Sequence, residues 1–448
     1  MRRTSIVLTM VLACGASTIR AQQADQQPAP VRPSPPFPNR ANEALPSWLR
    51  VRGEFRERFE GFSHGGFTPE RDDSYFLSRL RVNAVVTPGR LFSATVQLQD
   101  ARVAQKQVGP TAPPFRGPLD LRMAYADIGD VQKGSVSVRA GRQELAFGEQ
   151  RLIGHLNWTN TARSFDGVRA TIRRGAYQVD VFGASVVRVQ DDSFDESGNG
   201  NRLGGAYGSL SKLVPNAVVE PYFLWRADRD LRTESATTGD LDQKTIGVRV
   251  NGRLPAGLDY GVEVAGQDGS LGSDSIGAWA GHWQLRESFS GRLSLRLIGE
   301  FNYASGDSNP TDGARGTFDQ LYPTGHDKLG LADQVGWRNI RHARAGLEIS
   351  PVRGWPVTAS HHTWWLANRH DSLYNAGGNP IARVAGGAAS TSVGQEIDVQ
   401  LTRAIVPQIL VAGGYAHMFT GPFLKEATPG ADYSYPYVMV TYVFLADR

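Results

Sequence analysis

Apolar and polar residues alternate along most of the chain from residue 48 onward. The pattern is clearest in residues 48–59, where one face carries arginine or glutamate at every second position. The opposite face is apolar, with Glu57 as its one exception. Because successive side chains of a β-strand point to opposite faces, this stretch predicts a strand between water and an apolar medium.

The same alternation recurs in about eighteen segments of roughly ten residues, the length of a tilted strand that crosses an outer membrane. We expect strands at residues 48–60, 75–87, 90–103, 119–128, 134–143, 164–173, 176–188, 203–212, 217–227, 244–253, 257–267, 275–287, 290–304, 339–350, 354–366, 393–403, 406–419 and 435–445. Short turns rich in Gly, Pro and Asn alternate with longer polar loops, the longest from about residue 305 to 338. Residues 47–448 are therefore predicted to be all-β, a transmembrane antiparallel β-barrel with short periplasmic turns and long extracellular loops.

Arginines on the polar faces are expected to point into the lumen. A charged side chain at the bilayer midplane costs ~2–4 kcal/mol, so a one-residue slip that turned these arginines toward lipid would be prohibitive. We predict a positive pore lining that lowers the barrier to carboxylates. Its members are Arg50, Arg52, Arg56, Arg58, Arg79, Arg81, Arg169, Arg173, Arg249 and Arg296.

An ordinary porin lumen, in which acidic residues pair with these arginines and no preference results, is the alternative. The candidate counter-charges are Glu54, Asp180, Glu220, Glu263, Glu300, Glu396 and Asp398. They lie mostly in the later strands, so we expect any anion preference to be local.

Composition narrows the function classes. The formal net charge of +4, from 48 basic and 44 acidic residues, is too balanced to suggest a nucleic-acid partner. Only six of the basic residues are lysine; genomic bias explains part of this, but guanidinium also suits planar contact with carboxylates. No apolar run approaches the ~18 residues of a membrane helix. Hydrolase, zinc-protease, redox and nucleotide motifs are missing from the sequence, so we predict neither enzyme activity nor a cofactor or metal.

The N-terminus has the features of an export signal. Two arginines, an apolar run and small residues precede Ala21, which predicts a signal peptide at residues 1–21. The only cysteine, Cys14, lies inside this signal, and lipidation there is an alternative reading. Residues 22–46 are Pro-rich and polar and are expected to form a disordered periplasmic lead. The chain is thus predicted to reach the bacterial outer membrane and its lipid.

Two longer motifs carry a resemblance to a known family. Residues 141–167 read GRQELAFGEQRLIGHLNWTNTARSFDG, and residues 318–340 read FDQLYPTGHDKLGLADQVGWRNI. A weaker match is GQEIDVQL followed by the stretch GGYAHMFTGPF that ends at Phe423. With these motifs the chain resembles the alginate-export family of outer-membrane proteins. The resemblance implies an eighteen-stranded barrel with a basic, loop-constricted channel that passes an anionic uronic-acid polysaccharide.

The first motif falls on a long-loop connection, yet it holds more packing residues than a solvated loop needs. We expect it to fold inward as a constriction loop whose charges pair with one another or with the wall. These charges are Arg142, Glu144, Glu149, Arg151, Arg163 and Asp166, and they either anchor the loop or contact the solute. The second motif could cover the mouth as a lid, with a less favoured cation site at Asp307, Asp312, Asp319, His326 and Asp327.

Three functions remain open at this stage. The leading hypothesis is passive diffusion of an anionic polysaccharide, alginate or a similar polyuronate, with periplasmic export components as possible partners. The second is a general porin that prefers small anions. The remote third is a secreted carbohydrate-active enzyme on a β-scaffold, with Glu and Asp pairs as acid and base.

Overall fold

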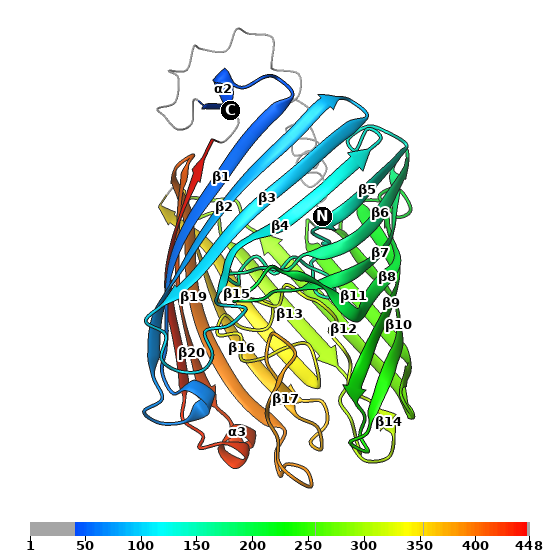
Figure 1. Ribbon diagram of the computed structural model, residues 1–448. Coiled ribbons are helices and arrows are strands. Elements are labelled where there is room, and N and C mark those ends of the chain that lie inside the picture. The colour runs from blue at the N-terminus through cyan, green and yellow to red at the C-terminus, as the bar shows by residue number, and fades with distance from the viewer. Residues whose placement is uncertain (1–40, 256, 353, 446–448) are drawn as a thin grey trace, which may run out of the picture.

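The structure is a computed structural model that describes residues 41–255, 257–352 and 354–445. Within these residues, eighteen long strands form a closed barrel in which every neighbouring pair is antiparallel (Figure 1). They are β1 (Leu49–Phe62), β2 (Asp73–Gly89), β3 (Phe92–Ala104), β4 (Gly117–Ile128), β5 (Val136–Gln143), β6 (Phe165–Arg174), β7 (Tyr177–Arg188), β8 (Glu196–Leu210), β9 (Ala217–Arg232), β10 (Thr238–Arg253), β11 (Asp259–Leu271), β12 (Asp274–Ser288), β13 (Arg296–Ala304), β15 (Ile340–Val352), β16 (Trp355–Leu366), β19 (Ser392–Val406), β20 (Ile409–Thr420) and β21 (Tyr433–Phe444). The first and last strands close the barrel, with partners from Gly53–Phe444 to Glu60–Tyr437. The predicted fold is confirmed.

The remaining elements are short. They are α2 (Ala41–Ala44), the 3-10 turn η1 (Gly65–Phe67), β14 (Ala314–Arg315), β17 (Leu373–Tyr374), β18 (Pro380–Ala382) and α3 (Pro422–Ala427). None of the described helices has the length and apolarity that crossing a membrane requires.

The end of the predicted disordered lead is ordered. Residues 41–44 form α2, and the Asn42 side-chain amide donates to the carbonyl oxygens of Val51 and Leu445 at 2.7 and 2.6 Å. The signal peptide, the lipidation alternative at Cys14 and the lead up to residue 40 lie outside the described residues, so they stay predictions.

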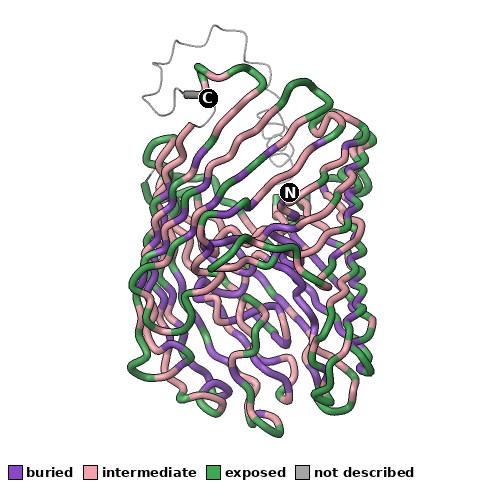
Figure 2. The backbone as a smooth tube through the Cα atoms, viewed as in Figure 1, coloured by how far each residue is buried: buried purple, intermediate pink, exposed green. Residues whose placement is uncertain are grey.

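Alternation of inward and outward side chains follows the sequence pattern. On β2, Arg79 and Arg81 are buried on the inner face, while Phe76 and Leu80 are about two-fifths exposed on the outer face. Figure 2 shows that buried and exposed residues follow one another along the strands. A one-residue shift of a strand would move every inward side chain to the outer face. The inward arginines therefore determine which face of each strand meets lipid.

Connections at the two ends of the barrel differ in length. The short turns lie at the top of Figure 1 and the longer loops at the bottom, as predicted for periplasmic and extracellular sides. Two connections on the loop side, residues 233–237 and 272–273, are as short as turns.

Parts of the longest loops pack against the inner face of the barrel. Residues 144–164, 305–339 and 367–391 contribute Leu145, Ile153, Phe318, Leu331, Trp337 and Leu373 to an apolar cluster with inward side chains of the strands. The prediction that the second motif lies over the mouth as a lid was wrong, because its apolar residues are buried within the lumen.

Glycines mark both ends of the first motif. A Cβ at Gly141, whose φ is +122°, would lie 2.2 Å from the Ala124 carbonyl oxygen. A Cβ at Gly167 would lie 2.3 Å from the Gly183 carbonyl oxygen. The strands that flank the loop therefore approach too closely for any larger residue without a backbone shift.

Candidate functional site: the constricted lumen

Four of the predicted pore arginines hold the first loop against the wall. Arg56 donates to the carbonyl oxygens of Asn157, Trp158 and Thr159 at 3.0–3.2 Å, and Arg58 donates to that of Trp158 at 2.6 Å. The Arg58 guanidinium also lies 3.9 Å from the centre of the Trp158 ring. The four arginines are Arg56, Arg58, Arg79 and Arg81, and each is at most 5% exposed. They bind carbonyl oxygens of the loop and do not face open space.

Asn160 also holds this loop in place. Its buried amide lies within 2.9–3.1 Å of three carbonyl oxygens, those of Ser78, Arg102 and Phe115. The three carbonyls belong to β2, β3 and the β3–β4 connection, so this single side chain ties the loop to all three segments.

The two family motifs pack on each other. Backbone bonds join Gly154 N to Tyr322 O at 2.9 Å and Tyr322 N to Leu152 O at 2.8 Å. Trp158 stacks on His326, with ring centres 3.7 Å apart and planes 2° from parallel. The loops therefore form one plug, which we define as residues 144–164 together with residues 318–339.

The candidate cation ligands of the second loop have other partners. Asp319 accepts from Arg226 at 2.6 Å, and His326 lies 2.8 Å from Asp333. Asp307 accepts from the backbone of Asn309 and Gly316. In the described part of the chain, no three metal-binding side chains converge.

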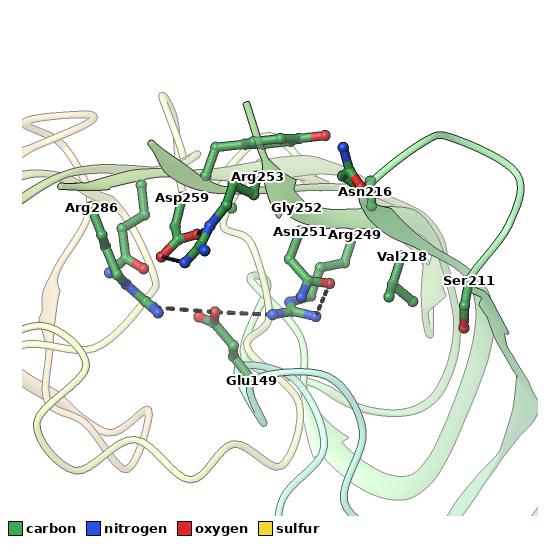
Figure 3. Close-up of a pocket in the computed structure, with 14 residues that line it drawn as sticks. Glu149, Ser211, Asn216, Val218, Arg249, Asn251, Gly252, Arg253, Asp259 and Arg286 are labelled. Atoms are coloured by element: carbon green, nitrogen blue, oxygen red, sulfur yellow. Dashed lines mark hydrogen bonds and ion pairs between the residues drawn. The ribbon is translucent and has the colours of Figure 1, made fainter. Parts of the chain in front are cut away.

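Two cavities of several hundred Å³ lie between the plug and the wall in the described part of the chain. Cavity A has a volume of about 450 Å³ and lies at the short-turn end, beside the turn at residues 211–216 and the ends of β10 and β11 (Figure 3). Cavity B, of about 540 Å³, lies along β12, β13, β15, β16 and β19. Glu149, Gln284 and Arg286 line both cavities, so these three side chains form the boundary between them.

Glu149 lies at the centre of a ring of basic groups. One carboxylate oxygen lies 3.0 Å from Arg249 Nη2 and 3.7 Å from Arg286 Nη2. The other lies 3.4 Å from Arg151 Nε and 3.6 Å from His282 Nε2. Burial alone would raise the pKa of Glu149, but the neighbouring Arg151, His282 and Arg249 outweigh it and lower the pKa to about 2. The group is therefore ionised at neutral pH.

The two cavities differ in charge. Cavity A is lined by three arginines and two carboxylates, which are Arg249, Arg253, Arg286, Glu149 and Asp259. Cavity B is lined by four basic and four acidic side chains, which are Arg151, Arg286, Lys328, Arg344, Glu149, Glu300, Asp327 and Glu348. The basic excess is therefore local, at the short-turn end.

Several of the predicted pore arginines pair with the predicted counter-charges. Arg249 contacts Glu220 as well as Glu149, and Arg79 lies 2.6 Å from Glu54. The contacts of the others are Arg169 with Asp180 at 3.8 Å, Arg173 with Gln178 at 3.0 Å, Arg296 with Glu348 at 3.0 Å, Arg81 with Gln99 at 2.7 Å and Arg50 with the carbonyl oxygens of Pro46 and Leu49. Arg52 lies exposed near the short-turn end.

The six predicted constriction charges fall into three groups. Glu149 and Arg151 reach the cavities, as described above. Glu144 pairs with Arg122, and Arg163 donates to the carbonyl oxygens of Gly154 and Pro323, so both stabilise the plug.

Arg142 and Asp166 are the third group and do not belong to the constriction. They pair with each other at 2.8 Å from neighbouring strands. Each shares the strand face of an outward apolar residue, Val136 for Arg142 and Val168 for Asp166. Arg142 precedes the loop at residues 144–164 and Asp166 follows it, each on a flanking strand, so the prediction was wrong for this pair.

Sequence reasoning missed the basic groups Arg253, Arg286, Lys328 and Arg344. Arg286 and Arg344 alternate with outward apolar residues in predicted strands, so the parity rule used for the other arginines would have found them. Lys328 lies in the second loop, where no periodicity places a side chain.

Comparisons with known proteins agree with this architecture. The sequence model of a family described as alginate export matches residues 47–437. Among solved structures, Acinetobacter baumannii OccAB2 is 11% identical with a TM-score of 0.60, over 89% of this chain and 99% of that one. Pseudomonas aeruginosa OccK2 (OpdF), solved in complex with glucuronate, is 10% identical with a TM-score of 0.59, over 88% and 98% of the two chains. At such identities the likeness shows the fold alone. The comparison with curated proteins finds no match.

Proposed function

Because this chain belongs to the alginate-export family and folds as an outer-membrane barrel, we propose that it passes acidic polysaccharides, alginate or a similar polyuronate, through the constricted lumen. Family and fold are those of channels, not of enzymes. Movement is by passive diffusion, since the proposal needs no step beyond binding and release.

Arg286 is the observation that carries the proposal. Its side chain is 38% exposed, lines both cavities and makes one ion pair within the described residues, at 3.7 Å to Glu149. A guanidinium that is accessible and loosely paired can bind a passing carboxylate in a bidentate manner. Arg249, on the other side of Glu149, supplies a second donor to the same space.

Burial of the other wall arginines sharpens the proposal. Arg56, Arg58, Arg79 and Arg81 are covered by the plug, so the solute path runs along the opposite wall, past cavities A and B. Low-dielectric walls around a few accessible arginines strengthen their field there. Periplasmic export components would deliver the polysaccharide to cavity A.

A general porin for small anions is the second candidate. Both cavities fall within the ~300–1,000 Å³ of typical small-molecule sites, and the plug narrows the lumen between them. The ligand in the OccK2 complex, glucuronate, is a single acidic sugar. A solute of that size would fit either cavity without threading.

Planar-bilayer recording tests the proposal and separates the two candidates. For a polyuronate channel, alginate fragments added on the short-turn side should interrupt the single-channel current, whereas neutral dextran of the same length should not. Interruption by glucuronate but not by alginate fragments would favour the small-anion porin. Indifference to both acids would contradict the proposed function.

A further inference from the structure

We infer that Glu149 is a tethered competitor that occupies the arginine pair used by solute carboxylates and exchanges with each carboxylate that passes. The inference rests on the proposed function and adds a specificity-determining residue to it. Arg249 and Arg286 already bind the carboxylate of Glu149. A solute carboxylate that displaces Glu149 would bind the same two guanidinium groups in the same positions.

Position supports this role. Figure 3 shows Glu149 reaching from the loop to the wall, between Arg249 and Arg286, with dashed lines to both. Glu149 and Arg286 line cavity A and cavity B alike. A solute that moves from one cavity to the other must therefore pass this ion-paired group.

The backbone around Glu149 is fixed, so that exchange needs only side-chain rotation. Phe147 stacks on Tyr207 and Phe182, with ring centres 4.8 and 5.1 Å apart. Gly148 has a φ of +52°, and a Cβ there would lie 2.6 Å from the Tyr207 hydroxyl oxygen, so glycine is needed for this close approach. Rotamer changes of a partly exposed side chain are far faster than loop movement.

A second set of partners receives the displaced carboxylate. Arg151 and His282 lie 3.4 and 3.6 Å from the carboxylate oxygen that is turned away from Arg249. Glu149 can thus give up Arg249 and Arg286 without becoming an unpaired buried charge, which would be costly. Exchange keeps every charge paired before and after each step.

Competition between Glu149 and solute carboxylates explains why the arginines that bind solute are already paired with a carboxylate of the protein. Conduction needs a site that attracts the solute but also releases it. Without Glu149, Arg249 would keep Glu220 as its acidic partner and Arg286 would lose its ion pair, so that the two arginines would hold each carboxylate of a polyanion and slow its passage. Glu149 weakens solute binding because a solute carboxylate must first displace it. It speeds release of the solute because its own carboxylate returns to the two arginines.

The test compares E149Q with E348Q in planar bilayers, using defined oligouronates and chloride as probes. Glu348 is the matched control because it lines cavity B only, pairs with Arg296 at 3.0 Å, and its loss removes the same charge from the lumen. For E149Q we expect current interruptions by oligouronate that last about tenfold longer and a higher chloride-to-potassium permeability ratio. The control should leave the duration of the interruptions within about twofold of the unmodified channel.

Equal durations for E149Q, E348Q and the unmodified channel would overturn the inference. Heat-modifiable gel migration verifies that each variant is folded. If E149Q does not fold, E149D takes its place: it keeps the charge but withdraws the carboxylate by one methylene, so longer interruptions are again expected and unchanged ones would count against the role. Failure of the proposed function looks different, since oligouronate would then not interrupt even the unmodified channel.

Discussion

At the scale of single residues, the alternation along a strand predicts whether a side chain points inward or outward. It does not predict which other residues cover that side chain. The alternation around Arg56 and Arg58 correctly predicts inward side chains, because the period of a strand is two. Their burial under loop carbonyls could not be predicted, since the covering residues lie about a hundred positions away along the chain. Arg286, by contrast, follows the same rule and stays accessible.

The lowered pKa of Glu149 predicts how its effect depends on pH. Since its pKa is about 2 instead of the usual 4.5, the pairing with Arg151 and Arg249 is fully present above pH 4.5 and is lost as pH falls through about 2. The difference in anion selectivity between E149Q and the unmodified channel should therefore be constant from pH 8 to pH 5 and fall to about half near pH 2. Reversal potentials measured across this range check the expectation; a difference that has already vanished at pH 5 would contradict it.

At the scale of elements, strands and loops were not equally predictable. All eighteen long strands were expected in the observed order, because each carries its own alternation, but β8, β9 and β10 extend five to seven residues further toward the loop side than predicted and β13 begins six residues later. The first loop was expected to fold inward because of its apolar content. The inward position of the second loop was missed, because it depends on pairing of Tyr322 with the first loop and on the hydrogen bond from Trp364 to the Leu329 carbonyl.

Asn160 offers a test of the plug as an element. N160A removes an amide whose two N–H groups are shared among three part-buried carbonyls, a loss of about 2 kcal/mol at roughly 0.5–1.5 kcal/mol per hydrogen bond. We expect a folded, heat-modifiable barrel whose current fluctuates more and whose loop at residues 144–164 is cut faster by added protease. N379A, at an exposed position in another loop, is the control. Steady current and unchanged cleavage in N160A would show that the loop is held by other contacts.

At the scale of the whole molecule, the net charge is nearly balanced, but the charges are unevenly distributed within the lumen. Most charges pair across strands, which agrees with the ordinary-porin alternative for much of the wall. An excess of arginine over carboxylate remains in cavity A, at the short-turn end. Selectivity is therefore expected to come from a short zone around Glu149, where the plug contacts the wall, and not from the net charge of +4.

Ion selectivity of the unmodified channel tests this account most directly. The protein is reconstituted in a planar bilayer under a KCl gradient, and the reversal potential is measured. We predict a potential of the sign that chloride preference produces, which should shrink as salt rises and screens the arginines. A potassium-preferring potential, or none at all from correctly folded protein, would contradict an arginine-controlled constriction.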